Sequence, residues 1–466
     1  MSYSVRSVRV AGLHDQFSVE LRFGPGLNII YGKNGRGKTT VLHILANLME
    51  RDFSRFLYLQ FASISVRFNS GDCIELISED SRQARGIAVA INGQLLQTFY
   101  DLNGQVEVGL ARALDKVLGP RAVYLPAFRS ILERTSNPYR YTAPNEAKAE
   151  YDKIVKGEAE ISRSHGAINI FPRRDEVHHA TAAKTLQCRQ WFGEFVPVIR
   201  YPSLSDVEQR LTTEYRQAKL EMASIEQKVF SESFARVFDA LAVDWEGPRK
   251  KTADLLRDVS SLVGKIRSKA EGQDEDIYGR ILTAVRRLYQ EGDTSAETTN
   301  RVLSLYAELL KRRSDEQDRL FSKIEDFEYS VNKFLDGKVL TVGDSSKADR
   351  YLGPFIRLGG GRRLRLSSLS SGERQVLTMI FCASRMSQGQ GIFLVDEPEL
   401  SLHVDWQRDI LMEVARQAGG RQVIACTHSP EVGADNPECI QFFEPDWSES
   451  YLFGDDVLDD DLSEGL

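Results

Sequence analysis

The stretch that most constrains the fold is "GKNGRGKT", residues 32 to 39, because of the segments on either side of it. Before it stands "GLNIIYG", an apolar run typical of a fully buried strand, and after it "TVLHILANLM", whose apolar residues recur at helical spacing. The stretch matches G-x-x-x-x-G-K-[ST] between a strand and a helix. In this setting successive backbone N–H groups turn inward at the positive end of the helix. The sequence therefore predicts a phosphate-binding loop in an α/β domain.

Individual residues of this loop have separate predicted roles. Lys38 is expected to reach the β and γ oxygens of a nucleotide, and Thr39 to offer its hydroxyl to Mg²⁺. The residues that we expect to bind the nucleotide here are Gly32, Lys33, Asn34, Gly35, Arg36, Gly37, Lys38, Thr39 and Thr40.

The segment "GIFLVDEPELSLH", residues 391 to 403, places two carboxylates directly after four apolar residues. Ligands of α/β sheets bind at the carboxyl ends of the strands. Asp396 is therefore expected to hold the Mg²⁺, through water, and Glu397 to orient and deprotonate an attacking water. An Asp-Glu pair on a surface is common, so the prediction depends on the buried run before the pair and on the phosphate loop.

A third element is "VIACTHSPE", a buried strand that ends in Thr427, His428 and Ser429. A lone histidine at a strand end more often packs or caps than takes part in catalysis. The order of the three motifs along the chain favours the second reading here. His428 is then expected to donate a hydrogen bond to the γ-phosphate.

The stretch "SLSSGERQ", residues 368 to 375, precedes an apolar run that predicts a helix. Small polar residues in this position usually form a helix cap. The free N–H groups that need a cap can also bind a phosphate. Both readings stay open from the residues alone.

The rest of the chain divides by pattern. Strands are predicted at 4–10, 17–23 and near 127, with an antiparallel meander over 61–93, and strands return from 338. Between about 135 and 345 the pattern is helical. Two runs there have heptad spacing, from Leu211 to Val229 and from Leu320 to Phe334. Paired helices of about 30 residues would form an antiparallel arm of about 45 Å; a compact helical bundle is the alternative.

Composition limits the class of protein. The chain has 60 Lys and Arg against 67 Asp and Glu, a net charge of −7, so overall charge does not predict nucleic-acid binding. No apolar run approaches the roughly 18 residues of a membrane span. The five cysteines contain no C-x-x-C pair, which argues against a zinc knuckle or a disulfide framework. We expect a cytoplasmic protein without a membrane partner, with a disordered acidic tail over 451–466.

The motifs together resemble the ATP-binding-cassette (ABC) ATPase heads of the SMC, Rad50, RecF and OLD branch. The resemblance rests on residues 32–39, on "LSSGE" at 369–373 as signature, on "IFLVDE" at 392–397 and on "THS" at 427–429. It implies an α/β fold: an ABC ATPase head, with a mixed sheet core and an antiparallel β subdomain, interrupted by a large α-helical, partly coiled-coil insertion. The expected domains are an N-terminal ATPase lobe (1–130), the insertion (131–345), a C-terminal lobe (346–450) and the tail (451–466).

The resemblance also implies how the site is completed. In this family two heads dimerise, and each ATP lies between one phosphate loop and the signature of the partner. The expected signature contacts are Ser370, Ser371, Gly372 and Glu373, with Glu397 and His428 catalytic and with Thr39 and Asp396 at the metal. "PELSLH" resembles the D-loop, which places Ser401 along the same dimer seam. The implied cofactors are ATP and Mg²⁺, and the implied self-partner is a head-to-head dimer or a higher homo-oligomer.

Two functions follow from the resemblance. "DEPELSLH" and "YLPAFR" look most like RecF, OLD and the ATPases of bacterial anti-phage systems such as PARIS and Septu. The first function is thus a nucleotide-gated sensor or scaffold in defence, with an effector in trans, such as a nuclease, and a phage-encoded trigger protein. We expect the effector on another chain, because the stretch after His428 is too short for the Toprim nuclease of OLD proteins.

The alternative is a RecF-like or SMC-like DNA-binding ATPase of repair or recombination. Its support is the basic stretches "GGGRRLRLSS", with Arg362, Arg363 and Arg365, and "FPRRD" at 171–175. A solvated strand edge explains them equally well. No glutamine can be assigned to the Q-loop of the family, whose approximate place is taken by "YLPAFRS" at 124–130. A transporter subunit is disfavoured for that reason and by the size of the insertion.

Overall fold

The computed structural model describes residues 4–80, 85–101, 104, 106–128, 147–164, 174–241, 252–269, 280, 283, 287, 296–344, 352–385 and 391–447. The chain forms two compact units, which we call the head unit (Met1–Val207 with Leu369–Leu466) and the insertion unit (Glu208–Ser368). These limits differ from the predicted domain boundaries at 130 and 345, and the predicted division stays a prediction. The acidic tail at 451–466 lies outside the described residues.

The core of the head unit is a five-stranded sheet in the order β14-β3-β13-β12-β8. All four neighbouring pairs in it are parallel. The strands are β3 (Leu27–Tyr31), β8 (Val123–Leu125), β12 (Phe393–Asp396), β13 (Val423–Thr427) and β14 (Ile440–Phe442). Because they are parallel, their carboxyl ends all meet one edge of the sheet. The strands predicted before the phosphate loop, before the carboxylates and before "THS" are confirmed.

Three helices of the head unit follow directly after the predicted motifs. They are α1 (Lys38–Met49), α10 (Ser371–Ser384) and α11 (Val404–Gln417). Helix α1 is buried along nearly its whole length. It contacts β12 and β13, so the phosphate loop is fixed to the strands that carry the other motifs.

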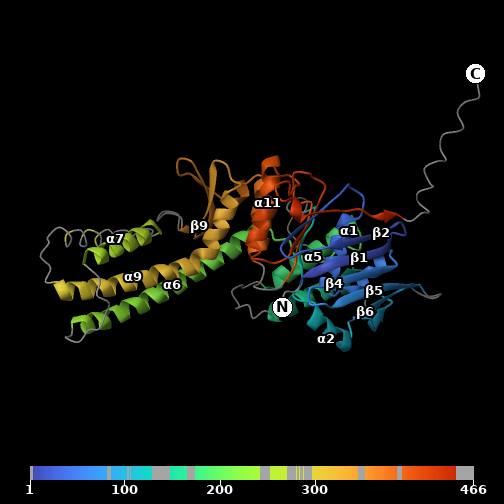
Figure 1. Cartoon of the computed structure of the whole chain (residues 1–466), viewed down its shortest axis with the longest axis horizontal. Coiled ribbons are helices and arrows are strands. Elements are labelled where there is room, and N and C mark those ends of the chain that lie inside the picture. The colour runs from blue at the N-terminus through green and yellow to red at the C-terminus, as the bar shows by residue number, and fades with distance from the viewer. Residues whose placement is uncertain are drawn as a thin grey trace, which may run out of the picture. The chain divides into compact units, whose positions relative to one another are not determined.

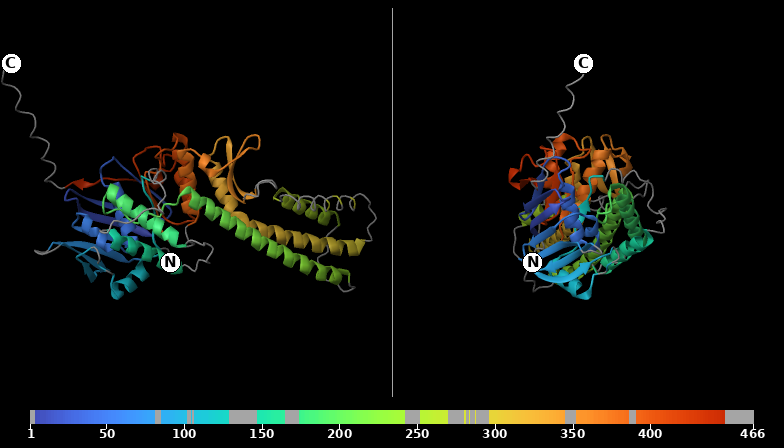
Figure 2. Two further views of the ribbon diagram at one scale, coloured as in Figure 1. Left: turned by 180° about the vertical axis from the view of Figure 1, so that it is seen from behind. Right: turned by 90° about the vertical axis from the view of Figure 1, so that its right-hand side faces the viewer.

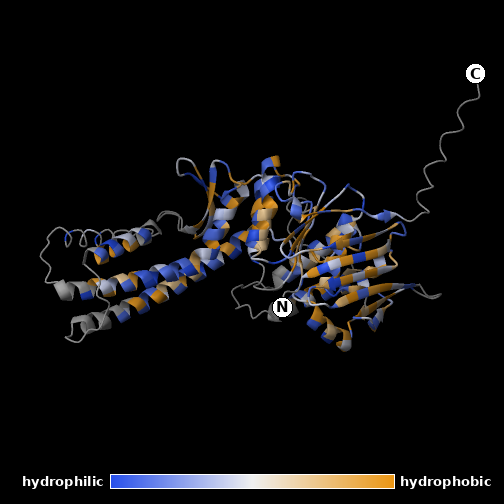
Figure 3. Ribbon diagram, in the orientation of Figure 1, coloured by the Kyte–Doolittle hydropathy of each residue, from blue (hydrophilic) through white to orange (hydrophobic). Residues whose placement is uncertain are grey.

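A second, antiparallel sheet has the order β15-β2-β1-β4-β5-β6-β7. Its strands are β1 (Val5–Leu13), β2 (Phe17–Arg22), β4 (Ser63–Phe68), β5 (Cys73–Asp80), β6 (Arg85–Ile91), β7 (Gln94–Phe99) and β15 (Asp446–Trp447). Strand β2 alternates buried and more exposed residues, as a sheet with one covered face requires. Figure 3 shows the resulting alternation of hydrophobic and hydrophilic residues in this sheet. The predicted meander is confirmed.

Helices α2 (Val108–Val117), α4 (Lys148–Ser164) and α5 (Arg174–Phe192) also belong to the head unit, as do the short 3-10 helices η1 (Phe53–Tyr58) and η5 (Pro437–Cys439). Buried charges attach α4 and the segment after α5 to the end of α1. Arg200 donates to Glu50 Oε2 and to Glu158 Oε1, each at 2.7 Å. Close by, Arg55 and Arg189 both pair with Glu150. These contacts explain why residues 147–164 and 174–207 belong to the head unit although their sequence pattern is helical.

The insertion unit contains most of α6 (Leu204–Leu241), α7 (Thr252–Lys269) and α9 (Ala296–Asn332). Helices α6 and α9 lie side by side and antiparallel, since Tyr215 contacts Phe321 and Arg312 pairs with Glu232 (Figures 1 and 2). Helix α7 packs on α9 through a cluster of Leu255, Leu256, Val259, Val263, Leu303 and Leu310. The two long helices therefore gain a third partner, which the heptad runs did not predict.

A three-stranded antiparallel sheet, β11-β10-β9, ends the insertion unit. It consists of β9 (Lys338–Asp344), β10 (Leu352–Leu358) and β11 (Arg363–Leu364), and is followed by η4 (Leu366–Ser368). Among the described residues, none of the helices combines the length and the hydrophobicity needed to cross a membrane.

Candidate nucleotide site

The register of the five-stranded sheet brings the three strand-end motifs together. Thr427 at the end of β13 pairs with Tyr31, which immediately precedes the phosphate loop. On the other side of β13, Cys426 pairs with Asp396 at the end of β12. The loops after β3, β12 and β13 are consequently neighbours at one edge, as the motif order predicted.

The phosphate loop has the backbone shape that its glycines permit. Gly35 and Gly37 have φ values of 75° and 94°, in the left-handed region where side chains are strained. A Cβ atom on Gly37 would also lie 3.0 Å from the ring of Phe17. Lys38 is 4% exposed, and its Nζ donates to the carbonyl oxygens of Gly32 at 2.7 Å and Lys33 at 3.0 Å. The ammonium group is therefore held inside the curve of the loop.

Thr39 and Asp396 lie within hydrogen-bond distance of each other. The Thr39 hydroxyl donates to Asp396 Oδ2 at 3.0 Å, and Asp396 is 2% exposed. A hydroxyl and a carboxylate beside a phosphate loop are oxygen ligands of the kind that Mg²⁺ takes with few protein groups. The pair thus fits the metal position predicted for these two residues.

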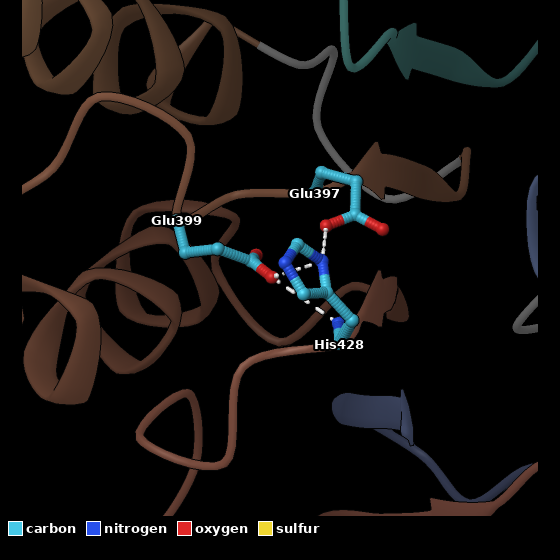
Figure 4. A group of neighbouring side chains, drawn as sticks. All are labelled: Glu397, Glu399 and His428. Carbon is cyan, nitrogen blue, oxygen red and sulfur yellow. Dashed lines mark hydrogen bonds and ion pairs between the residues drawn. The ribbon is translucent and has the colours of Figure 1, made fainter. Parts of the chain in front are cut away.

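Glu397, Glu399 and His428 form a cluster at the same edge, drawn in Figure 4. The Nδ1 atom of His428 forms a hydrogen bond with Glu397 and lies 3.3 Å from Glu399 Oε1. Glu397 has a φ of 48°, which is uncommon for a residue with a side chain. Burial, and next the charge of Glu399, raise the pKa of Glu397 to about 7, while His428 acts in the opposite direction. The structure brings both predicted catalytic residues into one contact.

Glu399 is the member of this cluster that the sequence reading missed. It is 6% exposed, and its Oε1 accepts hydrogen bonds from the Thr427 hydroxyl and from the backbone N–H groups of His428 and Ser429. A signal was present in "DEPE", where a second carboxylate follows two residues after the first. Only the fold reveals that it turns towards β13.

The signature stretch is a helix N-terminus with a reciprocal cap. The Ser370 side chain accepts from the Glu373 N–H at 3.4 Å, and the Ser370 N–H donates to Glu373 Oε2 at 2.7 Å. Ser370 and Ser371 are exposed, whereas Gly372 is buried, and a Cβ atom there would lie 2.7 Å from the Ser401 carbonyl oxygen. The helix-cap reading is therefore confirmed, and the cap leaves two serines at the surface.

The fold and the edge of the sheet define a class of protein. This class is the phosphate-loop nucleotide-binding domain, here divided by a helical insertion. Its parts are a phosphate loop between β3 and α1, carboxylates after β12 and polar residues at the end of β13. The family model described as "AAA domain, putative AbiEii toxin, Type IV TA system" matches residues 242–435. This range includes the signature, the β12 carboxylates and His428, and the phosphate loop precedes it.

Two curated relatives are similar to part of the chain. The retron Ec83 probable ATPase of Escherichia coli is 27% identical over 193 residues, which cover 38% of this chain and 33% of that protein. The retron Vc95 probable ATPase of Vibrio cholerae serotype O1 biovar El Tor is 24% identical over 156 residues, covering 30% and 29%. The chain thus matches about a third of the length of these relatives. The family match and the relatives confirm the predicted resemblance to ATPases.

Solved structures similar to the whole chain include an Smc head domain with an extended coiled coil from Pyrococcus furiosus. It is 13% identical with a TM-score of 0.39, covering 96% of this chain and 97% of that one. The recombination mediator protein RecF is 12% identical with a TM-score of 0.30, covering 95% and 98%.

Proposed function

We propose that this chain binds ATP with Mg²⁺ at the edge of the five-stranded sheet and hydrolyses it to ADP and phosphate. One observation carries the proposal: Lys38 and the Thr39–Asp396 pair lie at the same sheet edge as the Glu397–His428 pair. The first group can hold a nucleotide and the second can activate a water. The names of the relatives, both probable ATPases, support it.

Each residue has a role that its position allows. The loop amides and Lys38 bind the phosphates, and Thr39 and Asp396 hold Mg²⁺, which when bound neutralises phosphate charge. Glu397 accepts a proton from the attacking water. His428 donates a hydrogen bond to the γ-phosphate through Nε2, since its Nδ1 is engaged by Glu397.

We further propose that two heads close on ATP, with Ser370 and Ser371 of one head against the nucleotide of the other. Both serines are exposed at the N-terminus of α10, where backbone N–H groups favour an anion. ATP binding would then control the association of heads, and through it an effector carried on another chain. The retron names of the relatives support a place in anti-phage defence.

The test begins with the wild-type chain and Mg²⁺-ATP. We expect phosphate release, ATP-dependent self-association by light scattering, and ATP-dependent association with the product of the neighbouring gene. A chain that binds no ATP would remove the proposal, whereas hydrolysis without any ATP-dependent association would remove only the scaffold role.

A DNA-binding ATPase is the second candidate function. Arg362, Arg363 and Arg365 are exposed around β11, and the Arg363 guanidinium lies 4.8 Å from the ring centre of Phe355. Such a hairpin could contact backbone phosphates. The first three residues of "FPRRD", 171–173, lie outside the described residues. Affinity for duplex DNA that falls with salt, and falls further in Arg363→Ala, would favour this candidate; no binding at low salt would exclude it.

A further inference from the structure

Glu399 connects the ends of two neighbouring strands. It follows β12 by three residues, yet its side chain reaches the residues that end β13. Its Oε1 accepts from the hydroxyl of Thr427 and, at 3.2 Å each, from the N–H groups of His428 and Ser429. A carboxylate that accepts two backbone N–H bonds at a buried site fixes the local backbone firmly. Glu399 thus holds the chain at His428, together with the Ser429 N–H bond to the Thr427 hydroxyl at 3.0 Å and the Ser429 hydroxyl bond to Gln407 at 2.8 Å.

The turn that carries Glu399 is itself held in place. The Glu397 N–H donates to the Cys426 carbonyl at 2.9 Å, and the Leu402 N–H donates to the Glu399 carbonyl at 2.9 Å. Ser401 has a φ of 62°, so the turn closes through a left-handed residue. The backbone of Glu399 is therefore held by hydrogen bonds within its own turn, while its side chain contacts the end of β13.

The same oxygen also lies beside the imidazole. His428 Nδ1 is 3.3 Å from Glu399 Oε1 and bonded to Glu397, so the ring stands between two carboxylates, as Figure 4 shows. The side chain of His428 is 42% exposed. A hydrogen bond at one ring nitrogen determines which way the other nitrogen faces. Glu399 therefore contacts both the backbone N–H and the ring of His428, and Glu397 holds the ring from its other side.

We propose that Glu399 is a positioning residue for ATP hydrolysis: it fixes the segment 427–429 and the imidazole of His428 so that Nε2 meets the γ-phosphate. This inference rests on the proposed function. A purely structural role, in which Glu399 only secures the turn, predicts a loss of stability without a specific link to His428. The two roles differ in whether the effects of Glu399 and His428 variants combine.

The experiment compares steady-state hydrolysis by the full chain across Glu399→Ala, Glu399→Gln, His428→Ala and the double Ala variant. Glu413→Ala is the matched control, because Glu413 is also buried, in α11, and pairs with Arg416 outside the cluster. Circular dichroism identifies variants that do not fold. If Glu399→Ala is among them, Glu399→Asp replaces it, since aspartate keeps the charge and loses the reach.

We expect Glu399→Ala to lower kcat about tenfold or more with KM changed less than about threefold, because the His428 N–H loses the Glu399 acceptor and the Ser429 N–H keeps only the Thr427 hydroxyl oxygen. Glu399→Gln keeps an acceptor oxygen and should stay within about threefold of wild type. The double variant should be no slower than His428→Ala, within about twofold. Glu413→Ala should keep its kcat.

Other outcomes separate the hypotheses. An unchanged kcat in Glu399→Ala, or losses that multiply in the double variant, would overturn the positioning role while the ATPase function stands. An equal loss in Glu413→Ala would assign the effect to stability and would also overturn it. A wild-type chain without hydrolysis would instead remove the proposed function on which the inference rests.

Discussion

The two units of the chain each contain a glutamate whose pKa is raised to about 7, and their surroundings differ. In both, burial is the largest cause. Glu328, on α9 of the insertion unit, accepts a hydrogen bond from the Val342 N–H of β9, which lowers its pKa in part. Glu397 stands beside a second carboxylate and an imidazole at the edge of a parallel sheet.

The comparison shows what marks a functional site. A raised pKa shows that a carboxyl group has lost contact with water, and burial causes this in the insertion unit as well as at the candidate site. What distinguishes Glu397 is the convergence of a phosphate loop, a second carboxylate and His428 around it. Substitutions at the sheet edge should therefore have effects that matched substitutions in the insertion unit or beside the signature do not have.

The largest effect is expected from Lys38→Ala. The ammonium group inside the phosphate loop is the cation that the resemblance assigns to the β and γ oxygens, so its loss should weaken ATP binding by about a hundredfold or more. Titration with a fluorescent ATP analogue measures this. Lys323→Ala, at an exposed position of α9, serves as control and should bind as wild type does. Equal affinities in both variants would place the nucleotide elsewhere.

The two glutamates themselves give the second test. Glu397→Gln should keep ATP affinity, lower hydrolysis by about a hundredfold or more and trap closed heads, because the amide cannot take a proton from water. Glu328→Gln should leave hydrolysis unchanged. Phosphate release and light scattering with ATP measure both variants. If Glu397→Gln hydrolysed ATP at the wild-type rate, Glu397 would not be the residue that accepts the proton. The two glutamates would then no longer differ in function.

Ser370→Arg should have a smaller effect, confined to association. Ser370 is exposed at the start of α10, and an arginine there would stand where the partner head is expected. Each phosphate loop should still bind ATP, but ATP-dependent self-association should fall about tenfold, as for a misplaced charge in an interface. Ser368→Arg, at an exposed serine of η4, is the control. Normal association in Ser370→Arg would count against head closure through the signature.

Much of the sheet edge could be predicted because its information is local. A buried run followed by polar residues gives the end of a parallel strand, and three such ends in one domain meet at the same edge. The loop at 32–39, the Asp396–Glu397 pair and the strand before His428 were all found in this way. Glu399 was not, because its partners are the last residue of β13 and the two residues after it, which lie 28 to 30 positions further along the chain.

The insertion was harder to predict for a related reason. Heptad spacing shows that a helix has an apolar stripe but does not identify the partner, so the packing of α7 on α9 went unforeseen. The docking of α4 and of the segment after α5 on α1 depends on ion pairs such as Arg200 with Glu50, 150 residues apart. Charges at that separation leave no periodic pattern in the sequence.

The smallest effect concerns Glu328 and the stability of the insertion unit. Its folded pKa of about 7 exceeds the ordinary value of 4.5, so between these values the folded chain holds more protons than the unfolded one. Stability from this group is complete below the unfolded pKa and is lost as the pH rises through 7. Glu328→Gln cannot titrate and keeps an acceptor for the Val342 N–H.

The melting temperature of Glu328→Gln relative to wild type should therefore rise between pH 5 and pH 8. The rise should be about 2 to 4 °C for each kcal/mol of unfolding free energy that the wild type loses over this range. Thermal denaturation followed by circular dichroism measures the difference. Glu308→Gln, at an exposed position of the same helix, should show no such trend. A constant difference across this range would mean that Glu328 titrates as an ordinary glutamate, and the raised pKa would then no longer be a property that Glu328 shares with Glu397.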